Sequence, residues 1–400
     1  MKILVLNCGS SSVKYKLLNM DTREELGSGG VEKVGLKGSF LKHTCGDGQK
    51  VIFEGEVLEH QTAIEYILGV LTSEKYGAIK TLNEIDAVGH RVVHGGEKFN
   101  SSVLITDEVI DMLEECIELA PLHNPPNLAG IRAISELLPD TPQVGVFDTA
   151  YHQTMPEHAY MYGIPYSLYK KYGIRRYGFH GTSHRYVSRR ACEFLGLDYE
   201  NSKIITAHIG NGVSVTAIEN GKSIDTSMGF TPLEGLMMGT RSGDVDLGVA
   251  PFLLEKEKLS SSALSALFNK HSGILGVSGI SSDMREIETA VAEGNDRAIL
   301  ALKMYEYRIK KYISSYIGVL NGVDVIVFTG GVGENQTTTR EYVCDGLSWF
   351  GIEIDRELNA KTRGKEALLT TSNSRVKVVV IPTDEEYMIA SDTLEIVGKK

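Results

Sequence analysis

The chain has 400 residues with 41 basic and 52 acidic side chains, which gives a formal net charge of −11. A field of that sign repels polyanions and argues against a nucleic-acid partner. The composition, with 42% hydrophobic and 23% charged residues, is that of a globular protein. No apolar run approaches the roughly 18–20 residues that cross a bilayer, and no secretory leader is recognisable. We therefore expect no membrane partner. The five cysteines form no close pairs, which is typical of a reducing compartment, so we expect a cytoplasmic protein.

The first part of the chain begins with two short strands joined by a glycine-serine turn. These strands are predicted over residues 2–6 and 13–18. The elements predicted next are a helix over 58–71, a strand over 85–93, a helix over 109–119, a helix opened by Asn124-Pro125-Pro126 and a strand over 143–147.

The same order of elements starts again near residue 203. Strands are predicted over 203–209 and 213–219, and Asn220-Gly221 is a two-residue hairpin turn. A long helix over 296–321, strands over 323–329 and 376–381 and a short final helix follow. This repetition predicts two related α/β domains with a ligand cleft between them. The first domain comprises residues 1–150 plus 386–400, and the second comprises residues 151–385.

Two glycine-rich turns have the composition of phosphate-binding loops. Residues 7–14 offer backbone N–H groups, three serine hydroxyls and Lys14. Residues 330–335 follow an apolar strand and would place a nucleotide at a helix N-terminus. Neither is a standard fingerprint: the Gly-Lys-Ser at 221–223 lacks the leading glycine of a Walker A loop, and Gln336 stands where a dinucleotide fingerprint needs its third glycine.

Other enzyme classes find little support in the sequence. Two histidine pairs with a spacing of four residues are present, but without HExxH or CxxC motifs a zinc site is disfavoured. The chain has no Gly-x-Ser-x-Gly elbow, so it is not predicted to be a serine hydrolase. Ligands of open α/β sheets bind at the carboxyl ends of strands. The polar residues at such strand ends are Arg91, Asp148, Asn211 and Glu385.

Eight motifs, in one order along the chain, resemble those of the acetate kinase family. They lie at residues 7–14, 89–96, 121–126, 147–149, 178–184, 239–241, 331–335 and 382–386. The family belongs to the superfamily of acetate and sugar kinases, chaperone ATPases and actin. The resemblance therefore implies two actin-like (ribonuclease H-like) domains with an interdomain active-site cleft, and a homodimer formed through the second domain.

The implied reaction is the reversible transfer of the γ-phosphoryl group of ATP to acetate, which gives acetyl phosphate and ADP by direct in-line transfer. Such a phosphotransferase acts through positioning and charge neutralisation. By resemblance, Arg91 would hold the acetate carboxylate and Asp148 would orient the site near the acyl phosphate. His180 and Arg241 would stabilise charge on the phosphoryl group in flight.

The resemblance also implies the binding residues. Mg²⁺, with Mn²⁺ as the alternative, would be held by Asn7 and Glu385, directly or through water. The acetate methyl group would lie in a small pocket, and the substrate contacts besides Arg91 would be Val93, Leu122, His123, Phe179 and Pro232. ATP or ADP would be held by Ser12, Lys14, His208, Ile209, Gly210, Asn211, Gly212, Asp283, Met284, Arg285, Gly331, Val332, Gly333, Glu334 and Asn335.

Three residues depart from the pattern of the family. Cys8 stands where alanine is frequent, Met284 where phenylalanine is frequent and Leu247 where proline is frequent. Two alternatives stay open. A propionate or butyrate kinase could use the same scaffold, because the sequence does not give the volume of the acyl pocket. A non-catalytic nucleotide switch of the actin or chaperone kind is disfavoured, because only fourteen residues follow Glu386 and no peptide-binding domain is appended.

Overall fold

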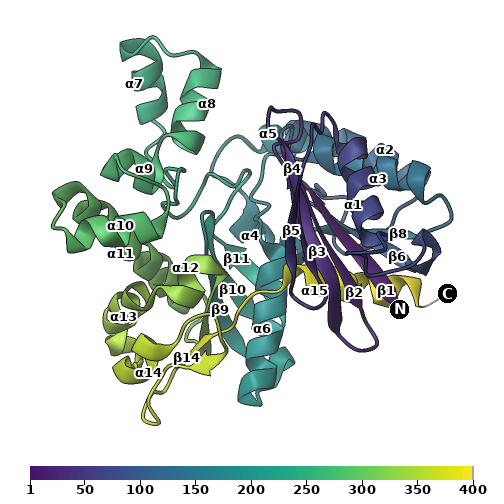
Figure 1. The fold of residues 1–400 in the computed structure, drawn as a ribbon. Coiled ribbons are helices and arrows are strands. Elements are labelled where there is room, and N and C mark those ends of the chain that lie inside the picture. Colours follow the sequence, from purple (N-terminus) through teal and green to yellow (C-terminus); the bar gives the residue numbers. More distant parts are fainter. Residues whose placement is uncertain (399–400) are drawn as a thin grey trace. The chain divides into compact units, whose positions relative to one another are not determined.

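The protein consists of two compact units, each of which is built on one β-sheet. The structure, a computed structural model, describes residues 1–398. Unit 1 comprises Met1–Tyr151 and the described residues from Asp384 onward, and unit 2 comprises His152–Thr383. Both units combine helices and strands (Figure 1), so the predicted α/β class is confirmed.

Unit 1 contains an eight-stranded sheet with the order β5-β4-β3-β2-β1-β6-β8-β7. Its strands are β1 (Lys2–Cys8), β2 (Ser12–Asn19), β3 (Glu24–Glu32), β4 (Phe40–Cys45), β5 (Lys50–Glu54), β6 (Ala87–Val92), β7 (Val103–Leu104) and β8 (Gln143–Phe147). Strands β1 to β5 form an antiparallel meander, whereas β1, β6 and β8 run parallel. The carboxyl ends of the three parallel strands therefore meet at one edge, where α/β sheets bind ligands.

Helices cover both faces of this sheet because apolar side chains alternate along β1. Leu4 and Leu6 pack on one face with Ile64 and Ile134. Ile3 and Val5, on the other face, pack with residues of the final helix. The helices of unit 1 are α1 (His60–Leu71), η1 (Leu82–Glu84), α2 (Asp107–Glu115), η2 (Cys116–Leu119), α3 (Asn124–Leu137) and α15 (Glu385–Val397), and η3 (Ala150–Thr154) spans the boundary between the units in the sequence.

Unit 2 contains a six-stranded sheet with the order β11-β10-β9-β12-β14-β13. Its strands are β9 (Lys203–Ile209), β10 (Val213–Glu219), β11 (Lys222–Thr226), β12 (Val325–Thr329), β13 (Ala367–Leu368) and β14 (Lys377–Val380). An antiparallel trio, β11-β10-β9, adjoins the parallel strands β12 and β14. The order and direction match β3-β2-β1-β6-β8 of unit 1, so the predicted relation between the two halves is confirmed.

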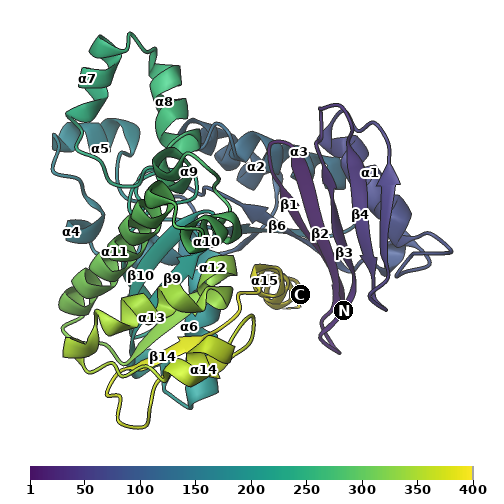
Figure 2. The ribbon, with the colours of Figure 1, turned by 60° about the vertical axis from the view of Figure 1, so that its left-hand side comes forward.

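The sheet of unit 2 is packed by α6 and by the long helix α11, which also contacts α9 and α10 (Figure 2). The helices of this unit are α4 (Glu157–Tyr160), α5 (Tyr166–Tyr172), α6 (Gly181–Leu195), η4 (Tyr199–Asn201), α7 (Val249–Lys256), α8 (Ser261–Lys270), α9 (Gly273–Ser278), α10 (Met284–Ala292), α11 (Asp296–Val319), α12 (Gly330–Asn335), α13 (Thr337–Asp345), η5 (Ser348–Phe350) and α14 (Arg356–Lys361).

Several predicted elements have the predicted bounds, and others differ. The strands over 143–147, 203–209 and 213–219 are confirmed as β8, β9 and β10. The helix predicted over 109–119 is wrong at its end, because α2 stops at Glu115 and the chain continues as the 3-10 helix η2. Among residues 1–398, no helix combines the length and hydropathy that crossing a bilayer requires.

Candidate active site

An arginine and two carboxylates meet at the ligand-binding edge of the unit 1 sheet. Arg91 lies near the end of β6, level with Val146 of the parallel strand β8. Asp148 follows β8, and its backbone N–H donates to the Val92 carbonyl at 3.0 Å. The Arg91 guanidinium donates to both Asp148 oxygens, from Nε at 3.0 Å and from Nη2 at 2.7 Å. This bidentate pair fixes the plane of the guanidinium.

The two carboxylates near Arg91 leave the Nη1 side of its guanidinium without a partner among the described residues. Glu385, at the start of α15, places Oε2 4.0 Å from Arg91 Nε. Asp148 is 1% exposed, and its charge raises the pKa of Arg91. Burial raises the pKa of Glu385 to about 7, although Arg91 opposes the shift. Within residues 1–398, Nη1 of Arg91 makes no hydrogen bond, so an incoming carboxylate can bind there.

The residues predicted to hold a metal carry donors that suit Mg²⁺. Asn7 lies next to Leu6, which is level with His90 of β6, so Asn7 reaches the same sheet edge as Arg91. Asn7 and Glu385 offer amide and carboxylate oxygens, which are the ligands of hard cations. The described part of the chain contains no cluster of three or more His, Cys, Asp or Glu that could hold a metal. A site with only one or two protein ligands is usual for Mg²⁺, because the ion retains several waters and also binds substrate phosphates.

Ser12 and Lys14 lie in the hairpin that follows Asn7. The Gly9 N–H donates to the Ser12 carbonyl at 2.8 Å, which closes the turn between β1 and β2. Lys14 pairs with Asn7 in the antiparallel register, and its side chain is exposed. It lines a hollow of about 440 Å³ together with Lys42 and Lys50.

The predicted acyl-pocket residues are divided between the two units. Val93, Leu122 and His123 belong to unit 1 and Phe179 and Pro232 to unit 2. The Val93 N–H donates to Asn127 Oδ1 at 3.0 Å. Leu122 is 68% exposed, whereas Phe179 is 3% exposed. The pocket that the resemblance implies for these five side chains therefore stays a prediction.

His180 and Arg241 lie together beside Gly212 in unit 2. A Cβ added to Gly212 would lie 3.3 Å from Cε1 of His180 and 3.4 Å from Nη1 of Arg241, so a side chain here would crowd both. His180 precedes α6 with a φ of 56°, a left-handed conformation that few residues other than glycine adopt. Its ring stacks on His208, with centroids 4.1 Å apart, and its Nδ1 lies 2.9 Å from Ser214 Oγ.

Arg241 is partly buried without a carboxylate partner. Its Nη1 donates to the Met238 sulfur at 3.8 Å, and within residues 1–398 no acidic group lies within ion-pair distance of it. Burial lowers the pKa of Arg241, because removal of a charged group from water disfavours the charge. Buried arginines are usually paired. An uncompensated guanidinium at this position is therefore suited to bind an anion.

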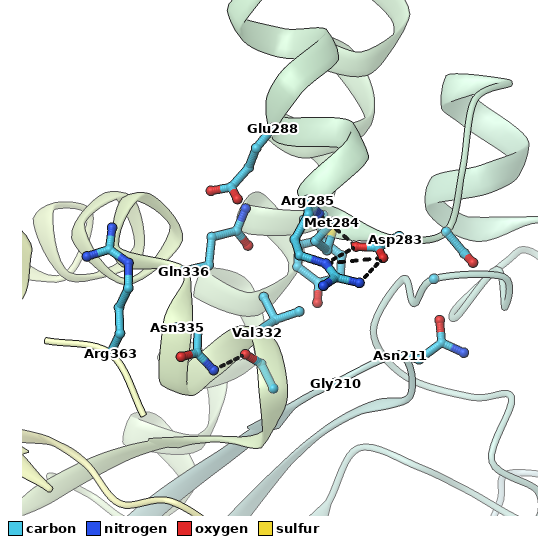
Figure 3. Close-up of a pocket in the computed structure, with 14 residues that line it drawn as sticks. Gly210, Asn211, Asp283, Met284, Arg285, Glu288, Val332, Asn335, Gln336 and Arg363 are labelled. Atoms are coloured by element: carbon cyan, nitrogen blue, oxygen red, sulfur yellow. Dashed lines mark hydrogen bonds and ion pairs between the residues drawn. The ribbon is translucent and has the colours of Figure 1, made fainter. Parts of the chain in front are cut away.

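Eight of the predicted nucleotide-binding residues line a pocket of about 610 Å³ in unit 2 (Figure 3). These eight are Gly210, Asn211, Asp283, Met284, Arg285, Gly331, Val332 and Asn335. The predicted residues that do not line it are His208, Ile209, Gly212, Gly333 and Glu334 of unit 2, and Ser12 and Lys14 of unit 1.

Local structure fixes the loops around this pocket. Gly330 has a φ of 78°, and a Cβ there would lie 2.9 Å from the Ile209 backbone, so only glycine fits. Glu334 Oε1 accepts hydrogen bonds from the N–H groups of Gly330 at 2.9 Å and Thr383 at 3.1 Å, which ties the turn to the end of the last strand. Asp283 caps α10 by accepting from the Arg285 N–H at 2.9 Å.

Six residues of the pocket lining were not predicted from the sequence as nucleotide contacts. They are Gly239, Ser282, Glu288, Tyr305, Gln336 and Arg363. Gln336 breaks a dinucleotide fingerprint, and its position one residue after the predicted loop is the sequence signal that could have marked it. Tyr305 lies on α11, far from any motif, and no sequence pattern marks it.

The two related sheets place the protein in the α/β class, and unit 2 combines the pocket with an arginine that no described carboxylate balances, which suits an anionic ligand. Residues 2–391 match the model of the Acetokinase family, and the chain belongs to this family. It is similar to the acetate kinase of Azobacteroides pseudotrichonymphae, with 66% identity over 398 residues that cover 100% of both chains. The acetate kinase of Bacteroides thetaiotaomicron is 63% identical over 399 residues, again with 100% of both chains covered.

Solved structures agree with this assignment. The crystal structure of Porphyromonas gingivalis acetate kinase is 63% identical, with a TM-score of 0.96 and 99% of each chain covered. A propionate kinase from Francisella tularensis is 42% identical, with a TM-score of 0.92 and 99% of each chain covered. Kinases named for two different acyl substrates therefore share this fold.

Proposed function

We propose that this chain transfers the γ-phosphoryl group of ATP reversibly to acetate, giving acetyl phosphate and ADP. Its family membership and the relatives named acetate kinase support the reaction. The observation that carries the proposal is the uncompensated Arg241 beside His180. A phosphoryl group in flight spreads negative charge over its equatorial oxygens, so preorganised cations stabilise the transition state more than the ground state.

In this proposal Arg91 binds the acetate carboxylate through its free Nη1 side. Asp148 holds the guanidinium in place through the bidentate pair. One acetate oxygen then attacks the γ-phosphorus while the bond to the ADP oxygen breaks, and Arg241 and His180 stabilise the transferring group. The electron pair of the broken bond leaves with ADP, so the transfer needs no covalent enzyme intermediate.

Mg²⁺ is the proposed metal, and it would neutralise phosphate charge when bound. Asn7 and Glu385 would hold it, directly or through water, and Mn²⁺ is the alternative. Ser12 and Lys14 would contact phosphates. The pocket of unit 2 would hold the nucleoside through its eight predicted lining residues. The acyl group would contact Val93, Leu122, His123, Phe179 and Pro232, as the family resemblance implies.

We propose a cytoplasmic location for the protein. The five cysteines are unpaired thiols, which supports a reducing cytoplasm. A homodimer formed through the second domain is proposed from the family resemblance alone. No nucleic acid or membrane is proposed as a partner.

Trapping of acetyl phosphate with hydroxylamine tests the proposed reaction. The protein is incubated with ATP, Mg²⁺ and acetate, and propionate and butyrate are assayed in parallel. Acetyl hydroxamate as the main product supports the proposal. A higher kcat/KM for propionate or butyrate identifies a kinase for longer acids, which the similarity to a propionate kinase makes the second candidate. Nucleotide binding without product from any acid identifies a switch.

A further inference from the structure

Gln336 is a buried amide in the nucleotide pocket whose polar atoms have no partner. It follows α12 and precedes α13, and it lines the pocket of unit 2. The residue is 5% exposed. Neither its Oε1 nor its Nε2 makes a hydrogen bond to any of residues 1–398. Since buried polar atoms are nearly always hydrogen bonded, this amide requires an explanation.

The neighbouring amide shows that the loop can satisfy such a group. Asn335 Nδ2 donates to the Gly331 carbonyl at 2.9 Å, within the same turn. In Figure 3, this hydrogen bond lies below Gln336, which is drawn among the residues that line the pocket. The loop therefore orders Asn335 internally and presents Gln336 to the pocket.

Tyr305 on α11 supplies a second unpartnered group. Its hydroxyl is buried, and it makes no hydrogen bond within the described residues. The residue is 1% exposed and lines the same pocket as Gln336. Burial raises the pKa of Tyr305, so its hydroxyl keeps its proton and can donate. Two elements distant in sequence thus contribute buried polar groups without partners to the lining of one pocket.

The chemistry of these groups indicates which part of a nucleotide they meet. A phosphate offers only acceptors and is bound best by cations or backbone N–H groups. A neutral carboxamide offers one donor and one acceptor side by side, which matches the adenine 6-amino group beside a ring nitrogen. Met284 and Val332, which also line the pocket, provide apolar contact for a flat ring.

We propose that Gln336 reads the 6-amino edge of adenine in the phosphoryl donor, with Tyr305 as an additional hydrogen-bonding group. Gln336 is then a determinant of base specificity and takes no part in the chemical step. This inference rests on the proposed function only in assuming that the donor is a nucleoside triphosphate.

The test compares ATP with purine riboside 5′-triphosphate, which lacks the 6-amino group, in the wild type and in Gln336→Leu. The wild type should prefer ATP by about 10–100-fold in kcat/KM, because the analogue leaves the buried amide unpaired. Gln336→Leu should lose most of this preference through a higher KM for ATP, with kcat and the KM for the analogue little changed. A merely structural role for Gln336 would weaken both nucleotides equally.

Two further variants sharpen the result. Gln61→Leu, which makes the same exchange on α1 of unit 1, should keep the wild-type preference. Tyr305→Phe should reduce the preference by less than Gln336→Leu does. If Gln336→Leu does not fold, Gln336→Met replaces it.

Calorimetry separates failure of this inference from failure of the proposed function. The ratio of the Kd values of ADP and purine riboside 5′-diphosphate measures base reading even if no acetyl phosphate forms. A preference for ADP that Gln336→Leu abolishes supports the inference. Equal affinities in the wild type, or an unchanged ratio in the variant, overturn it.

Discussion

Replacement of Arg241 by methionine should separate activity from stability. Arg241 is partly buried, its Nη1 donates only to the Met238 sulfur, and burial lowers its pKa. Methionine fills a similar volume and removes a charge that no described acidic group balances. We therefore expect the free energy of unfolding to stay constant or to rise by about 0.5–2 kcal/mol, as for other functional groups that are retained at a cost in stability.

The same substitution should reduce kcat strongly. Loss of one preorganised charge stabiliser lowers kcat by about 10²–10³-fold, and arginines that act in phosphoryl transfer reach higher factors. Since the contribution is made in the transition state, the affinity for ADP should change little. Steady-state kinetics in both directions, calorimetry with ADP and urea unfolding provide the three measurements.

Arg176→Met is the matched control in the same unit. Arg176 donates to Glu234 at 2.7 Å and to the carbonyls of Thr226 and Ser227 at 3.0 and 3.1 Å. Its loss removes the ion-pair partner of Glu234, although the Tyr162 hydroxyl still donates to that carboxylate, and should cost about 1–3 kcal/mol of stability. If Arg241→Met destabilises the protein as much as this control and keeps a near wild-type kcat, the transition-state role is refuted.

Three other perturbations have defined outcomes. Arg91→Ala should raise the KM for acetate and cost about 2–4 kcal/mol in kcat/KM, with little effect on the KM for ATP. An unchanged KM for acetate would contradict the proposed binding of the acetate carboxylate by Arg91. The wild type should use acetate better than propionate and propionate better than butyrate, because each methylene is worth about 1–3 kcal/mol in a small apolar pocket. Equal kcat/KM values for the three acids would exclude such a pocket. Burial raises the pKa of Glu306 from 4.5 to about 7, so its contribution to stability is fully present below pH 4.5 and is lost as the pH rises through 7. Glu306→Gln, which keeps an acceptor for the Thr339 hydroxyl, should therefore be more stable than the wild type by about 2–3 kcal/mol at pH 8 and similar to it at pH 4.5. Urea unfolding at both pH values measures this difference, and an equal stability at pH 8 would show that Glu306 is not held neutral.

The sequence predicted those strands whose apolar runs end at polar or glycine residues. Strand β9 runs from Lys203 to Ile209 and is followed by Gly210, so both ends are marked. Strand β3 was missed because its segment contains Gly27, Gly29 and Gly30, which weaken any strand pattern. Close strand approach explains these glycines: a Cβ on Gly29 would lie 2.0 Å from the Lys42 carbonyl oxygen. Pairing with both neighbours, which is not visible in a local pattern, holds this segment in the sheet.

The candidate site was predictable where motifs lie at strand ends, and less so elsewhere. The motif at 331–335 lines the nucleotide pocket with three of its residues, but Gly333 and Glu334 do not line it, and Glu334 secures the turn instead. A motif marks a segment without showing which of its side chains face the ligand. Tyr305 could not be found, because only the packing of α11 brings it to the pocket. The roles of these residues in binding and catalysis stay predictions.

The return of α15 to unit 1 has a consequence for how the protein is made. Ile389 and Ala390 of this helix pack against Ile3, Val5 and Val146, all of which are synthesised before unit 2 begins. Adding residues 152–383 at about 5–20 residues per second takes roughly 10–50 s, and during this time one face of the nascent sheet lacks its apolar cover. We therefore expect the emerging chain to need shielding by a chaperone on the ribosome, and early termination within α15 to release an aggregation-prone unit 1 beside an already folded unit 2.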